Sequence, residues 1–360
     1  MIFIEVMKER FGEFEGETVW KWTMINDHDM RMSVLNYGAI VTSLETKDKF
    51  GDFANISLGF TNLDDYLAHS PYFGATLGPV AGRITNGQFS LDGKQFQLIQ
   101  NEGSNHRHGG KFNFSKKLWD VSVEKSLDQI VMTFEYCWAD GENGYPGKID
   151  AKMTYTLNNK NEWLVDYEAR SNQPTIYNPS NHIYFNLSGE AGSTVLQHQL
   201  WVNSDSFLPI DEEFLPIDEE FLPIGEKRLA ENTIFDLRAG REVAEITQSQ
   251  DQQVKLVGAG LDHTFILKHE NGRPDAVLFD PKSGRRLEME TKADSVLIYT
   301  ANSLDGSFEI DERAVPKYAG ITMETQGLVD AINHEGFGDI VLRPEKPFTS
   351  RTAFRFTVES

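Results

Sequence analysis

Apolar and polar residues alternate in short blocks that recur along the chain. A period of two places one face of a segment in a core and the other in solvent, as in a half-buried β-strand. In the last block, Phe354, Phe356 and Val358 share one face. Asp92-Gly93 stands between the alternating segments Phe89–Leu91 and Phe96–Leu98 and predicts a two-residue hairpin. Strands are predicted over Val131–Tyr136, Ala151–Leu157, Trp163–Ala169, Val296–Thr300 and Ala353–Val358.

Helical periodicity is scarce. Leu63–His69 predicts one or two helical turns capped by Asn62, and no longer segment keeps an apolar stripe at helical spacing. A Rossmann fold or an α/β barrel is therefore not expected. Because no Gly-, Ser- or Pro-rich linker interrupts the blocks, we predict an all-β protein, with one domain over residues 1–360 built as a large antiparallel β-sandwich.

A heptad is duplicated within residues 207–226. Phe207–Glu213 and Phe214–Glu220 are identical, and Phe221–Glu226 is an altered third unit. The proline in each unit removes a backbone donor and blocks a helical turn, so a coiled coil is not expected. Insertions in surface loops cost little free energy, and we expect a local duplication in an exposed acidic loop.

The charge balance limits the partners. The 360 residues include 34 Lys and Arg against 55 Asp and Glu, for a formal net charge of −21. Such a chain repels phosphate backbones and anionic lipid, so we expect neither a nucleic acid nor a membrane as partner. A small neutral or cationic ligand fits better, and we expect a monomer or a homodimer.

The single cysteine and the N-terminus bear on the compartment. Cys137 has no partner for an internal disulfide, and its place in the apolar run Val131–Trp138 predicts a buried, inert thiol. The N-terminus lacks an apolar stretch of signal-peptide length, and no run of about 18 apolar residues occurs. We therefore expect a cytoplasmic protein.

Several motifs of known chemistry are missing from the sequence. It contains no GxGxxG after a predicted strand, no GxxxxGK[ST], no HExxH and no GxSxG. His106-Arg107-His108 would place two imidazoles on one face of a strand, but no second His cluster or Cys pair completes a metal site. We expect neither a metal nor an organic cofactor.

Five titratable residues stand within otherwise apolar strand sequence. Burial of such groups is costly unless they are paired, so they indicate either a satisfied core network or a functional site. From the residues alone, both interpretations stay open. The five are Arg83 in Gly78–Ile84, His108 in Asn105–Gly110, His182 in Asn178–Asn186, Asp262 in Gly260–Phe265 and Glu324 in Ile321–Gln326.

At these residues the chain resembles the galactose mutarotase (aldose 1-epimerase) family. The resemblance runs from Asn36–Ala39 to Ile340–Pro344 and implies a large antiparallel β-sandwich, the mutarotase-like supersandwich, with one sugar cleft. The blocks that support it are Leu58–Phe60, Tyr72–Ala75, Gly141–Gly147, Phe235–Arg238, Glu324–Gln326 and Asp330–Asn333.

The resemblance implies a role for each of the five residues. Glu324 stands where the family has its general base, and His182 where it has its general acid. Arg83, His108 and Asp262 stand where the family contacts sugar hydroxyls. With ordinary pKa values near 4.3 and 6.5, the carboxyl would be ionised at pH 7 and about a quarter of the imidazole protonated, which supplies a base and an acid together. Interconversion of α and β anomers would then need no cofactor.

The chain also departs from the family pattern. Gly82 replaces an Asn and Leu297 a Gln that contact sugar in many members, and Pro79 and Val329 replace a frequent Arg and Pro. Lost polar contacts of roughly 0.5–1.5 kcal/mol each would change the preferred sugar. The alternatives are a hexose-6-phosphate 1-epimerase, a maltose epimerase and a non-catalytic sugar-binding protein. A glycoside hydrolase ranks lowest, because it needs a pair of carboxylates.

Overall fold

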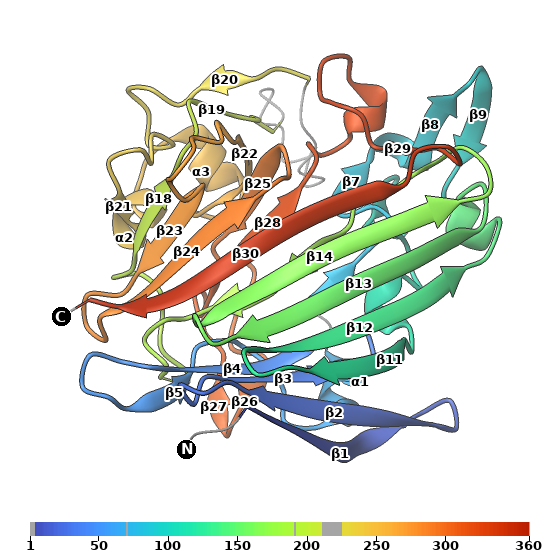
Figure 1. Ribbon diagram of the computed structural model, residues 1–360. Coiled ribbons are helices and arrows are strands. Elements are labelled where there is room, and N and C mark those ends of the chain that lie inside the picture. Colours follow the sequence, from blue (N-terminus) through green and yellow to red (C-terminus); the bar gives the residue numbers. More distant parts are fainter. Residues whose placement is uncertain (1–3, 70, 191, 211–224, 360) are drawn as a thin grey trace.

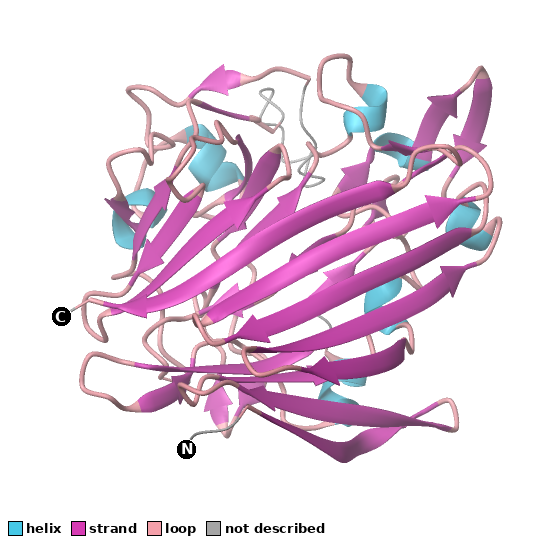
Figure 2. Cartoon of the chain, viewed as in Figure 1, coloured by secondary structure: helices cyan, strands magenta, loops and turns pink. Residues whose placement is uncertain are grey.

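Strands dominate the computed structural model, which describes residues 4–69, 71–190, 192–210 and 225–359 (Figure 2). They form three larger sheets of five, nine and six strands, together with several two-stranded ribbons. All paired strands described are antiparallel, which confirms the all-β prediction and its antiparallel sheets.

The five-stranded sheet follows the chain order from the N-terminus. It lies below the long central strands in Figure 1, where it is drawn in blue. Its strands are β1 (Glu5–Phe14), β2 (Glu17–Ile25), β3 (Arg31–Leu35), β4 (Val41–Lys47) and β5 (Phe53–Asn55).

In the nine-stranded sheet, the C-terminal strand lies between the strands Glu162–Ser171 and Arg285–Thr291. It contains four of the predicted alternating blocks, of which Ala353–Val358 lies next to Trp163–Ala169. In order, its strands are β11 (Asp120–Lys125), β12 (Gln129–Trp138), β13 (Ile149–Asn158), β14 (Glu162–Ser171), β30 (Phe348–Val358), β24 (Arg285–Thr291), β23 (Ala276–Phe279), β18 (Gln199–Val202) and β21 (Arg241–Glu242).

The six-stranded sheet packs against the nine-stranded one through aromatic side chains. The ring centroid of Phe185 lies 5.5 Å from that of Phe354, which itself stacks on Trp163 at 5.1 Å. These rings belong to one continuous buried cluster, as expected for a sandwich. In order, the strands are β17 (Tyr184–Phe185), β28 (Ile321–Gln326), β25 (Ser295–Tyr299), β22 (Asp262–Ile266), β19 (Ser206–Phe207) and β20 (Arg228–Leu229).

The remaining described strands pair in two-stranded ribbons. β8 and β9 are joined by Asp92-Gly93, which confirms the predicted hairpin. The ribbons are β7 (Arg83–Ile84) with β10 (His106–Arg107), β6 (Ala75–Leu77) with β16 (Ser180–His182), β8 (Gln88–Leu91) with β9 (Lys94–Gln97), β15 (Thr175–Ile176) with β29 (Val341–Leu342), and β26 (Glu309–Ile310) with β27 (Arg313–Ala314).

The helices are short. The predicted helix is present as α1 (Leu63–Ala68), and the Asn62 side chain caps it by accepting from the Asp65 amide at 2.9 Å. α2 (Val243–Thr247) and α3 (Gln252–Leu256) were not predicted, because five residues are too few to show a period. No helix in the described ranges is long and apolar enough to cross a membrane.

The prediction that Cys137 is buried is wrong. Cys137 is exposed, whereas its neighbours Phe134 and Trp138 are buried on the inner face of β12. Successive strand residues point to opposite faces, and Cys137 has the parity of the outer face. The exposure of this thiol therefore follows from the alternation along the strand and not from the apolar composition of the segment.

Most of the duplicated heptads lies outside the described residues, because positions 211–224 are among those left undescribed. The first four residues of the first unit belong to the core rather than to an exposed loop. Phe207 is 1% exposed and stacks on Phe235 with ring centroids 4.1 Å apart. The Ile210 amide donates to Gln253 Oε1 at 2.8 Å. The expectation of an exposed loop is therefore wrong for residues 207–210.

A substitution in the first heptad and deletion of the second heptad should differ in their effect on stability. Phe207→Ala removes a buried, stacked ring and should lower the free energy of unfolding by about 3–5 kcal/mol. From the sequence, deletion of Phe214–Glu220 should change it by less than about 1 kcal/mol, since it removes only one of two identical copies. Urea unfolding followed by fluorescence measures both, and equal losses would contradict the prediction.

Candidate active site

The five residues singled out in the sequence all line one pocket. Its volume is about 550 Å³. A hollow of about 790 Å³ beside Phe60 and Phe308 contains none of them. The pocket is lined by Pro71, Tyr72, Gly82, Arg83, Glu102, Arg107, His108, His182, Tyr184, Leu256, Val257, Gly258, Asp262, Leu297, Tyr299, Asn302, Ser303 and Glu324.

Strand register places two carboxyl groups on the same wall. Glu324 lies in β28 and is opposite Leu297 of β25, and Tyr299 of β25 is opposite Asp262 of β22. Every residue of β28 is buried, because the strand has neighbours on both sides and a sheet packed against it. Glu324 is only 2% exposed. A carboxyl group in such a strand is unfavourable for folding, which points to a function.

His182 faces Glu324 from a different element. It ends β16, which pairs with β6, and its Nε2 lies 3.4 Å from Glu324 Oε1. Thr322 Oγ1 donates to the same oxygen at 3.1 Å. Within the described part of the chain, His182 Nδ1 and Glu324 Oε2 have no protein partner. The pair thus keeps hydrogen-bonding capacity for a ligand.

Burial removes the charge from both members of this pair. Burial, and next the nearby carboxylate of Asp262, raises the pKa of Glu324 to about 8. Burial, and next the positive charge of Arg107, lowers the pKa of His182 to about 3. Both shifts are desolvation effects that favour the neutral forms. The expectation of an ionised Glu324 beside a partly protonated His182 is therefore wrong, because these shifts leave the proton on the carboxyl at pH 7.

Arg83 lies inside the pocket wall and is not a surface ion-pair residue. Its side chain is 7% exposed, and its Nε and Nη2 donate to Glu102 at 2.5 and 3.1 Å. Arg107 is directly opposite Arg83 in the β7–β10 ribbon and donates from Nη1 to the same carboxylate at 2.7 Å. The sequence analysis did not select Glu102 or Arg107 as site residues.

A left-handed backbone at His108 explains why Arg107 was missed. His108 has φ of 50°, so the strand alternation ends there, and Arg107 and His108 both line the pocket. His106 instead points into the core and bonds the Tyr145 hydroxyl at 2.7 Å. The expectation of two imidazoles on one face is therefore wrong. No group of three or more potential metal-ligating His, Cys, Asp or Glu residues occurs within the described ranges.

His108 is held by the loop that carries Gly82. The His108 amide donates to the Gly82 carbonyl at 2.8 Å, and the Gly82 amide donates to His108 Nδ1 at 3.1 Å. Because Nδ1 accepts, the neutral ring carries its proton on Nε2. Burial lowers the pKa of His108 well below its ordinary value, and Arg107 acts in the same direction. His108 is thus a neutral hydrogen-bonding group.

Asp262 is the first residue of β22 and lies partly exposed in the pocket. Loss of water around it raises the pKa of its carboxyl, and the charges of Arg83 and Arg107 act in the opposite direction. The residues that follow it form a strand and not a turn. All five residues therefore lie together in one pocket, as the resemblance implied.

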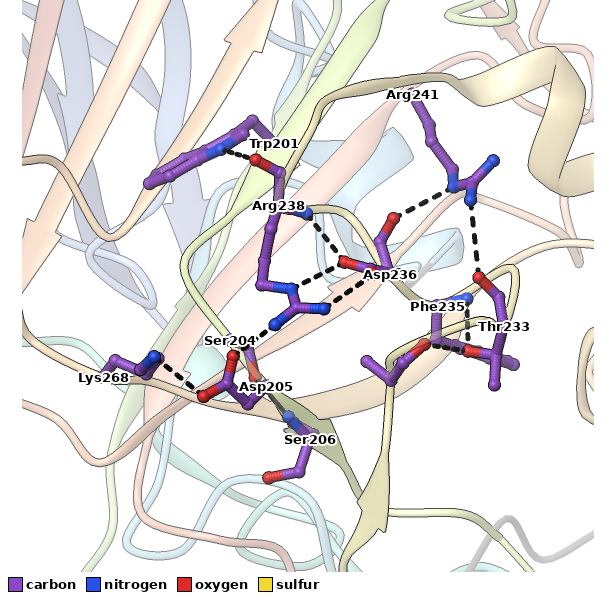
Figure 3. Close-up of polar contacts among 11 residues, drawn as sticks. Trp201, Ser204, Asp205, Ser206, Thr233, Phe235, Asp236, Arg238, Arg241 and Lys268 are labelled. Atoms are coloured by element: carbon purple, nitrogen blue, oxygen red, sulfur yellow. Dashed lines mark hydrogen bonds and ion pairs between the residues drawn. The ribbon is translucent and has the colours of Figure 1, made fainter.

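The block Phe235–Arg238 packs against β22 through the Phe235 ring. Arg238 joins Asp236 and Asp205, and Trp201 Nε1 donates to the Arg238 carbonyl at 2.6 Å (Figure 3). The Phe235 ring lies 4.8 Å from the ring of His263, the residue after Asp262. This network therefore supports the strand that presents Asp262.

Two of the pocket positions at which the resemblance would supply a polar side chain carry none. Leu297 is buried opposite Glu324, and Gly82 has φ of 72°, where a side chain would be strained. A Cβ at Gly82 would lie 3.1 Å from Val329 Cγ2. The pocket consequently lacks two of the hydrogen-bonding groups that the resemblance would supply.

The comparison with known families decides which family has this pocket. Residues 21–355 match the family Aldose 1-epimerase. The chain belongs to the aldose 1-epimerase family. It is 37% identical to the galactose mutarotase of Homo sapiens over 357 residues, which cover 98% of this chain and 99% of that protein. It is 30% identical to the aldose 1-epimerase of Escherichia coli over 349 residues, which cover 96% and 97%.

A solved relative confirms the aldose 1-epimerase fold. The crystal structure of galactose 1-epimerase from Lactobacillus acidophilus superimposes with a TM-score of 0.87 at 29% identity, covering 99% of this chain and 100% of that one. The predicted mutarotase-like supersandwich is therefore correct.

Replacement of the buried carboxyl should stabilise this epimerase at alkaline pH. The folded-state pKa of Glu324 is raised above its ordinary value of 4.5 to about 8, so the folded state loses stability as the pH rises from the first value through the second. Glu324→Gln removes this titration. Its melting temperature should exceed that of the wild type by a margin that grows by a few degrees from pH 6 to pH 9.

Glu168→Gln is the matched control, because Glu168 is exposed on β14 of the nine-stranded sheet. This variant should show no such trend. A margin for Glu324→Gln that stays constant between pH 6 and pH 9 would mean that Glu324 does not titrate with a raised pKa.

Proposed function

We propose that the chain is an aldose 1-epimerase that interconverts the α and β anomers of free aldohexoses, with Glu324 as general base and His182 as general acid. The observation that carries this proposal is the buried pair itself, with Nε2 and Oε1 3.4 Å apart in a pocket that could hold a pyranose. A non-catalytic sugar-binding protein would need neither group. Retaining both at the expense of stability favours catalysis.

The reaction needs two proton transfers on neighbouring oxygens. Glu324 removes the proton from the hydroxyl on C1 while His182 delivers one to the ring oxygen, so the C1–ring oxygen bond breaks and an open-chain aldehyde forms. Rotation about C1–C2 presents the other face of the aldehyde. The reverse transfers then close the ring and return each proton, so that acid and base exchange roles and no net proton is consumed.

The two groups act as a unit that holds one proton. The two pKa shifts leave this proton on Glu324, and its transfer to His182 gives the ion pair required for base and acid. A sugar hydroxyl donating to Glu324 Oε2, which has no partner among the described residues, would favour the carboxylate form. Binding of the sugar thereby helps to form the reactive charge state.

The other pocket groups suit an uncharged sugar. Arg83 and His108 Nε2 can donate to hydroxyl oxygens, and Asp262 can accept from hydroxyl groups. Fixing the sugar at several points allows both transfers to occur in one orientation. The cytoplasmic location stays a prediction. The monomeric or homodimeric state also stays a prediction.

Polarimetry tests the activity directly. Freshly dissolved α-glucose, α-galactose and maltose should reach anomeric equilibrium faster with the wild-type protein, and the ranking of the three reports the sugar preference. Glu324→Gln and His182→Asn should each lower the rate by about 10²–10⁴-fold, because each removes one positioned proton transfer. Sugar binding, measured by calorimetry, should survive in both variants. A near wild-type rate in either variant would remove that residue from the mechanism.

The pH–rate profile should follow the proton count of the pair. The rate should be level near pH 6–7 and fall as the pH rises through about 8, where Glu324 loses its proton and the pair no longer contains an acid. Initial rates in buffers of constant ionic strength measure this limb. The residual activity of Glu324→Gln is the control and should lack the limb. A wild-type rate that keeps rising to pH 9.5 would contradict the one-proton requirement.

A further inference from the structure

Arg83 and Arg107 form an unfavourable cross-strand pair. They are directly opposite each other in the antiparallel ribbon of β7 and β10. The Cβ atoms of such pairs lie about 4.5–5.5 Å apart, and like charges there destabilise the ribbon. Two guanidinium groups at this position therefore require compensation.

Glu102 provides that compensation from within the pocket. One of its oxygens accepts from Arg83 Nε at 2.5 Å, and the other accepts from Arg83 Nη2 at 3.1 Å and from Arg107 Nη1 at 2.7 Å. Charge-assisted contacts of this kind fix the planar guanidinium groups. A single carboxylate thus holds both arginines in one arrangement.

Arg107 keeps hydrogen-bonding capacity in this arrangement. Its Nε is buried and has no partner among the residues that the structure describes. The guanidinium carbon lies 5.8 Å from the ring centroid of Tyr72, which also lines the pocket. The side chain is about one-third exposed. An arginine that lines the pocket with a partly exposed side chain, and that Glu102 holds in place, is suited to bind hydroxyl oxygens.

The positive charges of Arg83 and Arg107 are balanced by Glu102 together with Asp262. Two guanidinium groups face two carboxyl groups, Glu102 and Asp262, while burial keeps Glu324 and the imidazoles neutral. An anionic sugar would meet arginines whose charge is already compensated. An uncharged sugar needs only their donors.

We propose that Arg107 is a second sugar-binding arginine of this pocket, and that Glu102, by bridging Arg107 and Arg83, restricts the pocket to uncharged aldoses. This inference rests on the proposed epimerase function. It concerns specificity and binding, and assigns neither residue a proton transfer.

Arg107→Met tests the first half of the proposal. Loss of the donors should raise KM for glucose or galactose about tenfold or more, while kcat falls much less. The alkaline limb should also move to higher pH, because the Arg107 charge helps to stabilise the Glu324 carboxylate. Arg107→Lys keeps the charge and should keep the limb in place, although it loses the planar geometry.

Arg351→Met is the matched control. Arg351 forms a two-point ion pair with Asp166 on the exposed face of the outer sheet, away from the pocket residues. Its KM should equal that of the wild type. An unchanged KM for Arg107→Met would overturn the assignment of Arg107.

Glu102→Gln tests the second half. With Asp262 as the remaining carboxylate beside two guanidinium groups, the pocket gains one net positive charge, which should raise the ratio of activity on glucose 6-phosphate to activity on glucose at least tenfold, and added salt should reduce this gain. Glu102→Gln combined with Arg107→Met removes one charge of each sign and should return the ratio toward the wild-type value. If Glu102→Gln fails to fold, a stable double variant still supports the charge balance, and a double variant with the same defect would overturn it.

The outcomes separate the inference from the function. A wild type without activity on any free aldose would end the proposed function. A wild type that is active on glucose, with an unchanged substrate ratio in folded Glu102→Gln, would overturn only the role of Glu102.

Discussion

The chemistry of the site depends on a carboxyl group and an imidazole that are buried together. Glu324 and His182 have side-chain exposures of 2% and 5%, and neither charged form is favoured without water. Their separation of 3.4 Å lets one proton belong to either group. The neutral pair and the ion pair contain the same number of protons. The surrounding groups therefore determine which of the two states is more stable. The pocket's arginines and the ligand's hydroxyl groups are the surroundings that can change this choice.

The architecture makes it possible to bury such a pair. β28 supplies Glu324 from within the six-stranded sheet, whereas the short β6–β16 ribbon supplies His182. The loop before Arg83 approaches the core closely, since a Cβ at Gly78 would lie 2.3 Å from the Phe114 ring. Phe114 in turn packs edge-on against Trp138 at 5.5 Å. Large aromatic contacts of this kind stabilise the fold enough to tolerate polar groups in its interior.

The sequence predicted those features that depend on a local repeat. Alternation predicted the long strands, Asp92-Gly93 the hairpin and Asn62 the helix cap, because each follows from neighbouring residues. The five pocket residues were singled out as titratable groups within apolar strand sequence, and the family resemblance implied their roles. Arg107 was missed because the left-handed φ at His108 interrupts the alternation, and a single residue's backbone torsion leaves no periodic signal. The protonation of Glu324 and His182 could not be predicted, since desolvation depends on side chains from distant strands.

The overall charge of the chain is a poor guide to what this pocket binds. A net charge of −21 argues against anionic ligands at long range. At physiological salt, however, the Debye length is about 8 Å, and exposed carboxylates beyond that distance are largely screened. Within the pocket two guanidinium groups lie beside one shared carboxylate, Glu102, at 2.5–3.1 Å. These short contacts are screened far less, so the local arrangement of three side chains, rather than the sum over the chain, determines the electrostatic environment of the sugar.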